Sequence, residues 1–353
     1  MGGRYGGAVD TERVEGVQVG RVTAWFERHV DGATPPLEFE LIAGGHSNLT
    51  YKVTDAAGNR FVLRRPPLGH VLATAHDMGR EHRVISALGP TPVPVAPALA
   101  FCGDADVNGA PFYVMGYVDG HVVRDAEAAK TVFTEAERRA AGHSLVDVLA
   151  EIHAVDPDEV GLGDLGRKEG YIDRQLRRWY AQWEQSRTRD LPAVDEVHAA
   201  LASSVPEQGP ATIVHGDYRL DNCMLDDRGH VVAVLDWEIC TLGDPLADVG
   251  LLLVYWTEPS DAHPALLTAP TVVDGFPSRA DLLARYAERS GRDVSAVDYY
   301  VAFGYWKLAC IVEGVYARYL GGAMGRTGTG FEGFSEQVER LAAAASTAMA
   351  RVG

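Results

Sequence analysis

Short apolar runs separated by turn residues make up most of the N-terminal part of the chain. Runs of this kind, bounded by Gly, Asn and Asp residues, are typical of strands joined by tight turns. We therefore expect a meander of three strands, at residues 39–42, 50–53 and 60–64. A rigid proline-rich connector at residues 90–94 separates the meander from a further apolar strand at residues 111–118.

Helical periodicity of apolar side chains dominates the remainder of the chain. Apolar residues that recur every three or four positions indicate amphipathic helices. We expect such helices at residues 23–29, 76–88, 136–153, 171–186, 296–319 and 334–351. The helix at 171–186 also carries Trp and Arg side chains, which would suit a substrate pocket for an anionic or acyl group, although core packing is the commoner explanation. In the helix at 296–319, Lys307 and Glu313 interrupt the apolar turns.

Near the middle of the chain, two short apolar runs each end in an acidic residue. The first leads into His215-Gly216-Asp217 and the second into Asp236. Residues 224–230 between them contain Asp-Asp-Arg-Gly, which predicts a tight hairpin that returns Asp236 to the neighbourhood of Asn222 and Asp217. Asp217 is then free to act as a base, while the amide oxygen and the second carboxylate suit a hard cation such as Mg²⁺. Phosphoryl transfer requires these groups.

A carboxylate also falls on the apolar face of the helix at 76–88. Glu81 shares that face with Met78, Ile85 and Leu88, and a buried carboxylate needs a partner. Arg64 is the partner we expect, because it shares a strand face with Val62 by alternation and could also reach phosphates. Exposure of Glu81 at the edge of the stripe is the open alternative. Arg65 would point to the opposite strand face, and would replace Arg64 only if the register is off by one.

Composition and charge narrow the class of protein. The chain has 353 residues, of which 46% are hydrophobic and 23% charged, as in ordinary globular proteins. The longest apolar run, at residues 249–256, is too short to cross a bilayer, and the first residues lack an apolar signal core. A net charge of −17 without an evident basic face argues against nucleic acid as a partner. The scattered Cys102, Cys223, Cys240 and Cys310 favour a reducing cytoplasm.

Several motifs in order resemble the aminoglycoside phosphotransferase family, whose kinase-like members phosphorylate small molecules. The motifs are His215-Gly216-Asp217 with Asn222, then Leu235-Asp236-Trp237-Glu238, then Gly243-Asp244-Pro245 with Asp248. The resemblance covers about residues 38–320. Residues 61–67 and the Arg and Trp residues of the 171–186 helix resemble the branch that includes the kinase-like domain fused to some acyl-CoA dehydrogenases.

This resemblance implies a fold and an activity. The fold would be a bilobal, protein-kinase-like α+β fold, with a small antiparallel-sheet lobe at residues 1–115 and a larger, mainly helical lobe at residues 116–353. The activity would be ATP-dependent transfer of the γ-phosphoryl group to a hydroxyl of a small molecule, a hydroxyacyl-type metabolite rather than an aminoglycoside. Asp217 would accept the hydroxyl proton, and Asn222 and Asp236 would hold Mg²⁺. Arg64, with Glu81, would position the phosphates.

The resemblance also implies where the nucleotide lies. The turn at residues 43–48 contains glycines and a small hydroxyl residue, and would cover the phosphates, where a plain hairpin turn is the alternative. The backbone of residues 115–118 would hold the adenine edge, where an ordinary core strand is the alternative. The implied nucleotide contacts are Gly44, Gly45, Ser47, Asn48, Arg64, Met115, Tyr117 and Val118.

One position departs from the family pattern, because Arg64 stands where the family normally has lysine. Arginine is planar and bidentate, so the exchange is not conservative. Either Arg64 cradles the phosphates or nucleotide binding is weakened, which leaves a nucleotide-binding pseudokinase with a regulatory role as the alternative function. The intact set of Asp217, Asn222 and Asp236 favours an enzyme. A metal-dependent hydrolase ranks third, because no further histidine has suitable spacing.

Overall fold

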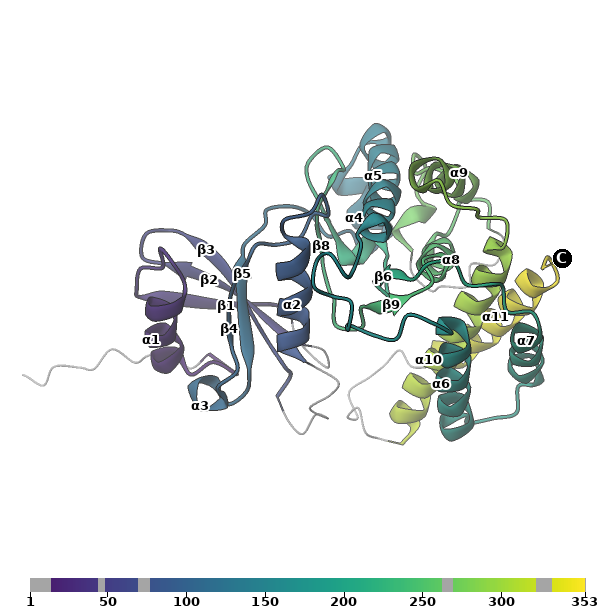
Figure 1. Ribbon diagram of the computed structural model, residues 1–353, viewed down its shortest axis with the longest axis horizontal. Coiled ribbons are helices and arrows are strands. Elements are labelled where there is room, and N and C mark those ends of the chain that lie inside the picture. The colour runs from purple at the N-terminus through teal and green to yellow at the C-terminus, as the bar shows by residue number, and fades with distance from the viewer. Residues whose placement is uncertain (1–13, 44–47, 69–76, 262–268, 322–331, 353) are drawn as a thin grey trace, which may run out of the picture. The chain divides into compact units, whose positions relative to one another are not determined.

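The computed structural model describes the chain outside residues 1–13, 44–47, 69–76, 262–268, 322–331 and 353. The chain divides into two compact units (Figure 1). Unit 1 comprises Met1–Pro90 and Val95–Val118, and unit 2 comprises Thr91–Pro94 and Asp119–Gly353. In the described part of the chain, no helix combines the length and the apolar composition that crossing a membrane requires.

Unit 1 is built on a five-stranded antiparallel sheet with the strand order β1-β2-β3-β5-β4. Its strands are β1 (Leu37–Ala43), β2 (Leu49–Asp55), β3 (Arg60–Arg65), β4 (Ala98–Cys102) and β5 (Phe112–Gly116). The predicted meander is present as β1 to β3, and β5 matches the predicted apolar strand. The edge strand β4 was not predicted, because it is short and only its last residue is fully buried.

Helices cover both faces of this sheet (Figure 1). They are α1 (Val19–His29), α2 (Met78–Leu88) and the short α3 (Ala105–Asn108), of which α3 was not predicted. On one face, Trp25 and Phe26 of α1 pack with apolar side chains from β2, β3 and β5 in a buried cluster. On the other face, α2 begins after Asp77, whose side chain accepts a hydrogen bond from the Arg80 amide, and buries the predicted stripe that includes Glu81. The two faces therefore separate Arg64 from Arg65.

Unit 2 is mainly helical, with two small antiparallel ribbons. The ribbons pair β6 (Thr212–Val214) with β9 (Thr241–Gly243) and β7 (Cys223–Leu225) with β8 (Val231–Val234). The helices are α4 (Ala126–Val132), α5 (Glu135–Ala154), α6 (Tyr171–Ser186), α7 (Pro192–Ser203), α8 (Leu246–Tyr255), α9 (Arg279–Ser290), α10 (Val297–Leu320) and α11 (Glu332–Met349). The shorter helices α4, α7 and α9 were not predicted, whereas the four long ones were, and α8 follows the Gly243-Asp244-Pro245 motif, where a helix was expected to begin. The α+β class expected from the sequence is confirmed.

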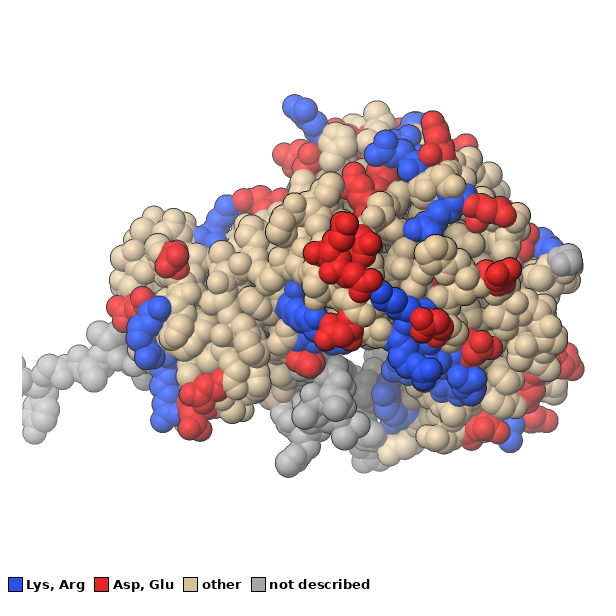
Figure 2. All heavy atoms as spheres, in the orientation of Figure 1, with Lys and Arg blue, Asp and Glu red and all other residues tan. Residues whose placement is uncertain are grey.

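The centre of unit 2 is the helix α8, which is buried from Leu246 to Val254. It packs against α10 so closely that a side chain at Gly250 would meet the backbone of Tyr300 at 2.5 Å. Leu251 and Val254 of α8 continue into a buried cluster with α10 and α11. This packing fixes Asp248 and Tyr255 of α8, whose side chains contact the loop that follows β6. On the face shown in Figure 2, basic side chains gather over α6, which carries Arg174, Arg177 and Arg178.

Candidate active site

The hairpin predicted at residues 224–230 is present and joins β7 to β8. Asp226 closes the turn, because its Oδ1 accepts hydrogen bonds from the amides of Arg228 and His230 at 2.9 and 2.8 Å. The Leu235 amide donates to the Asn222 carbonyl at 2.8 Å, so the residue before Asp236 lies against Asn222. Asp236 itself has a left-handed φ of 64°, which Asp and Asn tolerate better than other non-glycine residues. The structure thus brings together Asn222 and Asp236.

The carboxylate of Asp217 is held by its neighbours while its side chain stays 27% exposed. Its Oδ1 accepts a hydrogen bond from the Tyr255 hydroxyl at 2.9 Å, and its Oδ2 accepts one from Asn222 Nδ2 at 3.0 Å. Arg219 Nε lies 3.4 Å from Oδ2. Burial and the adjacent carboxylate raise the pKa of Tyr255 well above its usual value, so its hydroxyl remains a donor. Asp217 therefore has a fixed orientation and an accessible edge.

The backbone of residues 215–222, which we call the 215–222 loop, is braced from α8. Asp248 accepts hydrogen bonds from the amides of His215 and Gly216 at 2.7 and 2.8 Å. His153 of α5 lies 3.4 Å from the same carboxylate. Burial raises the pKa of Asp248, but the hydrogen bonds and charge of its partners outweigh this and hold it below its usual value. The loop thus rests on an ionised, buried carboxylate.

In unit 1, Arg64 and Glu81 form a buried ion pair, with Nε of the arginine 2.9 Å from Oε2 of the glutamate. Glu81 is 1% exposed, so the alternative of a solvent-exposed Glu81 is wrong. Asn48 Nδ2 and the Tyr113 hydroxyl also donate to this carboxylate, at 2.9 and 3.0 Å. Sequence reasoning missed Tyr113, although its buried hydroxyl in an apolar strand needed a partner. The cluster holds the arginine in one orientation.

The structure describes some of the other residues that we expect to contact the nucleotide, and not others. Gly44, Gly45 and Ser47 lie outside the described residues. Met115 pairs with Val62 across β5 and β3, and the Tyr117 amide donates to the Arg60 carbonyl at 3.4 Å. Met115, Tyr117 and Val118 are half-buried. Asn48 is 2% exposed, and its amide is engaged with Glu81.

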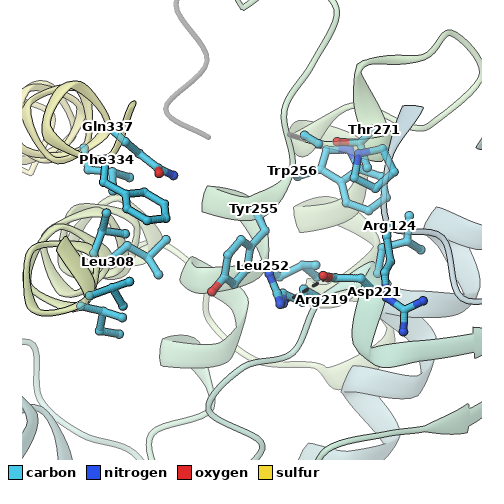
Figure 3. A pocket seen from close by; sticks show the side chains of 17 residues that line it. Arg124, Arg219, Asp221, Leu252, Tyr255, Trp256, Thr271, Leu308, Phe334 and Gln337 are labelled. Atoms are coloured by element: carbon cyan, nitrogen blue, oxygen red, sulfur yellow. Dashed lines mark ion pairs between the residues drawn. The ribbon is translucent and has the colours of Figure 1, made fainter. Parts of the chain in front are cut away.

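A pocket of about 640 Å³ lies in unit 2 (Figure 3). Its lining includes Arg219 and Tyr255, which both contact the Asp217 carboxylate. Its walls are mostly apolar and come from α8, α10 and α11, with Leu252, Trp256, Leu308, Ile311, Phe334 and Leu341 among them. The charged lining residues are Arg124, Arg219 and Asp221, and Gln337 of α11 extends its amide into the space. Helix α6 contributes no side chain to this pocket.

Comparison with known proteins identifies the family to which the chain belongs. A model of the phosphotransferase enzyme family matches residues 38–285. Acyl-CoA dehydrogenase family member 10 of Mus musculus is 35% identical over 296 residues, which are 82% of this chain and 27% of that protein. Family member 11 of Gallus gallus is 33% identical over 292 residues, 80% of this chain and 37% of that protein. The chain therefore spans about a third of the length of these relatives.

Solved structures agree with this assignment. A Ralstonia eutropha protein assigned to the aminoglycoside phosphotransferases is 32% identical, with a TM-score of 0.83 over 96% of this chain and 99% of that one. The GDP complex of aminoglycoside 2'-phosphotransferase-IIIa shares the fold, with a TM-score of 0.60 and 14% identity over 93% of this chain and 97% of that one. The predicted kinase-like fold is thus confirmed. Its motifs, its fold and the match over most of its length show that the chain belongs to the phosphotransferase enzyme family.

Proposed function

We propose that the protein transfers the γ-phosphoryl group of ATP to a hydroxyl of a small molecule. The hydroxyl oxygen bonds to the γ-phosphorus, the bond from that phosphorus to the β-phosphate oxygen breaks, and the hydroxyl proton passes to Asp217. The observation that carries this proposal is the Asp217 carboxylate, which is oriented by Tyr255 and Asn222 yet 27% exposed. General-base catalysis needs a fixed, accessible carboxylate of this kind.

The residues around Asp217 suit Mg²⁺. Asn222 Nδ2 donates to both the carbonyl and the carboxylate of Asp217, at 2.8 and 3.0 Å, which leaves the amide oxygen as a ligand. Asp236 adds a carboxylate beside the same backbone. Mg²⁺ prefers oxygen ligands and is usually bound by one or two carboxylates together with substrate phosphates. When bound, Mg²⁺ would neutralise charge on the nucleotide phosphates.

Arg64 of unit 1 is the proposed phosphate contact. Glu81 engages its Nε, and NH1 lies at the limit of hydrogen bonding to Thr50 Oγ1, at 3.5 Å, so the planar fork is oriented before any ligand arrives. A planar, pre-oriented guanidinium suits bidentate contact with phosphate. The nearby backbone of residues 115–118 would meet the adenine.

Arg64→Ala is expected to raise KM for ATP and to lower kcat. A charge-assisted hydrogen bond contributes roughly 1.5–3 kcal/mol, so KM should rise about tenfold or more. Arg64→Lys keeps the charge but loses the planar fork, and a near-complete loss of activity in this variant would indicate bidentate contact. Steady-state kinetics with varied ATP measure both effects.

The neighbouring Arg65 provides the control. It is 6% exposed and donates to the carbonyls of Gly16 and Asn108, on the sheet face away from Glu81. Arg65→Ala should therefore lower the free energy of unfolding, by about 2 kcal/mol or more, with little change in KM for ATP. If Arg65→Ala instead raises KM for ATP without lowering stability, the phosphates contact the opposite face of β3.

The acceptor is proposed to be a hydroxyacyl-type molecule rather than an aminoglycoside. Support comes from the pocket, where the charged side chains among the described lining residues, Arg124, Arg219 and Asp221, are set in mostly apolar walls. Charge complementarity in such a lining favours an apolar chain with an anionic group over a polycation. The similarity to proteins named as acyl-CoA dehydrogenase family members points the same way.

Transfer from γ-labelled ATP to a panel of acceptors tests the activity and the acceptor class together. The panel holds 3-hydroxyacyl and 4-hydroxyacyl coenzyme A thioesters, the corresponding free hydroxy acids, and kanamycin. Label should pass to hydroxyacyl compounds and not to kanamycin. Transfer to none of a wide hydroxylated panel would favour the pseudokinase alternative, and transfer to kanamycin alone would reject the acceptor class.

A pocket variant locates the acceptor. Ile311→Asp places a charge in the apolar wall and should raise KM for the acceptor by about tenfold or more, because an apolar chain would then desolvate a carboxylate. Leu320→Asp is the matched control, since Leu320 lies on the same helix, is 53% exposed and is outside the pocket. KM for ATP should stay the same in both. Equal KM values for the acceptor in the two variants would place the acceptor elsewhere.

A further inference from the structure

Lys307 of α10 is a buried ammonium beside the 215–222 loop. The residue is 7% exposed, and its Nζ donates a hydrogen bond to the carbonyl oxygen of Gly216 at 3.1 Å. The indole ring of Trp179 lies 5.7 Å from Nζ. An ammonium that leaves water loses several kcal/mol of hydration unless charges and hydrogen bonds compensate. The position of this lysine therefore needs a reason beyond packing.

The charges around Lys307 come from three elements. Asp217 of the 215–222 loop and Asp248 of α8 attract the ammonium, and Arg178 of α6 repels it. Burial lowers the pKa of Lys307, an effect that the two carboxylates oppose and Arg178 reinforces. The ammonium is thus a counter-charge both to Asp217, the proposed base, and to Asp248, which holds the 215–222 loop.

The hydrogen bond acts on the peptide group that carries Asp217. Gly216 has a left-handed φ of 85°, a conformation that glycine adopts without strain. Its amide is held by Asp248 at 2.8 Å, and its carbonyl is held by Lys307 at 3.1 Å. Because that carbonyl and the Asp217 amide belong to one planar peptide unit, fixing the carbonyl fixes the direction in which Asp217 leaves the backbone. Asp248 and Lys307 therefore hold the glycine from opposite ends.

We propose that Lys307 is a positioning residue for phosphoryl transfer, whose ammonium holds the Gly216–Asp217 peptide in the orientation that presents the Asp217 carboxylate. The inference rests on the proposed role of Asp217 as the base. Lys307 contacts the loop backbone, so its effect is on the placement of the base.

Lys307→Met and Lys307→Ala test the role in kinetics. Because a small misplacement of a reacting group costs on the order of 100-fold in rate, kcat should fall by roughly 30- to 100-fold with KM for ATP nearly unchanged. In Lys307→Ala, added propylammonium, which matches the missing part of the side chain, should restore much of kcat. The neutral 1-propanol should restore little. Equal rescue by 1-propanol, or a normal kcat in Lys307→Met, would overturn the role of the ammonium.

The stability of the Lys307 variants distinguishes a positioning role of this lysine from a role in folding alone. Removing one partner of a buried charge pair is destabilising, so the Lys307→Met protein should unfold at a lower denaturant concentration than the wild type, and kcat is compared under conditions in which both proteins are folded. Loss of kcat together with a large loss of stability, and without rescue by propylammonium in Lys307→Ala, would point to a structural role alone.

Hydrogen exchange tests the contact without any enzymatic assay. Amides of the 215–222 loop should exchange faster in Lys307→Met than in the wild type. Glu313→Gln is the matched control, because Glu313 is a second buried charge on α10 and contacts Thr188 and Arg189 rather than the loop. Its loop exchange should equal that of the wild type. Unchanged exchange in Lys307→Met overturns the inference. If exchange is faster in Lys307→Met but the wild-type protein phosphorylates no acceptor, only the proposed function is overturned.

Discussion

Asp217→Asn is expected to lower kcat by about 100-fold or more while Mg-ATP binding stays nearly intact, because loss of a general base costs roughly 10²–10⁴-fold. The carboxylate lies within hydrogen-bonding distance of Tyr255 and Asn222 and remains partly exposed. An amide at this position keeps the shape of the side chain but accepts no proton from a hydroxyl at neutral pH. Single-turnover transfer and calorimetry with Mg-ATP measure the two properties separately.

The local consequences of this substitution need a control. Asp217 accepts hydrogen bonds at both oxygens, so an Asn would turn one donor toward the Tyr255 hydroxyl or the Asn222 amide. Tyr255→Phe removes one of these donors and should reduce kcat far less than Asp217→Asn. Asp221→Asn removes another acid beside Arg219, 3.1 Å from its Nε, and should change KM for the acceptor more than kcat. A near-normal kcat in Asp217→Asn would exclude Asp217 as the base.

The parts of the site that follow from local periodicity were predictable from the sequence. Alternation along β3 assigns Arg64 and Arg65 to opposite sheet faces, and helical spacing puts Glu81 on the buried side of α2. Together they predict the ion pair that the structure contains. The hairpin was equally predictable, because its turn chemistry is local.

The pocket was not predictable in the same way. Its lining joins α8, α10 and α11 with a short segment at residues 269–271, which are far apart in the sequence. The spacing of apolar residues shows that each helix has a buried face, but it does not show which neighbour, or which cavity, that face meets. The aromatic and basic helix at residues 171–186 drew attention by composition, yet it lies outside the pocket lining.

Lys307 illustrates an intermediate case. A lysine inside an apolar helical stretch is visible in the sequence as an interruption, and its burial predicts some compensating partner. The partner is a backbone carbonyl, which carries no sequence signal at all. Tyr113 and Tyr255 are similar, because a tyrosine among apolar residues indicates that its hydroxyl needs a hydrogen bond but does not indicate which acceptor it meets.

Asp236→Asn should weaken Mg-ATP binding by about 10- to 100-fold or more. Loss of a residue that only supports a metal ligand already lowers metal affinity by that factor, and Asp236 is proposed as a ligand itself. The reason is the donor set, in which Asn222 offers an amide oxygen and Asp236 the carboxylate that a hard cation requires. Asn is the appropriate replacement because φ at this position is 64°, where Ala would add roughly 1–2 kcal/mol of backbone strain. Calorimetry at several Mg²⁺ concentrations should show that binding no longer depends on the metal.

Asp227→Asn is the control for this change. It removes one negative charge from the same hairpin, but the Asp227 side chain is 94% exposed and its partner is His121. Mg-ATP affinity should therefore match the wild type, because an exposed charge at the turn is screened by solvent. If both variants lose affinity equally, the effect of Asp236 is one of general charge. If Asp236→Asn keeps the affinity and the Mg²⁺ dependence of the wild type, the metal is held by other residues and the proposed pairing of Asn222 with Asp236 is wrong.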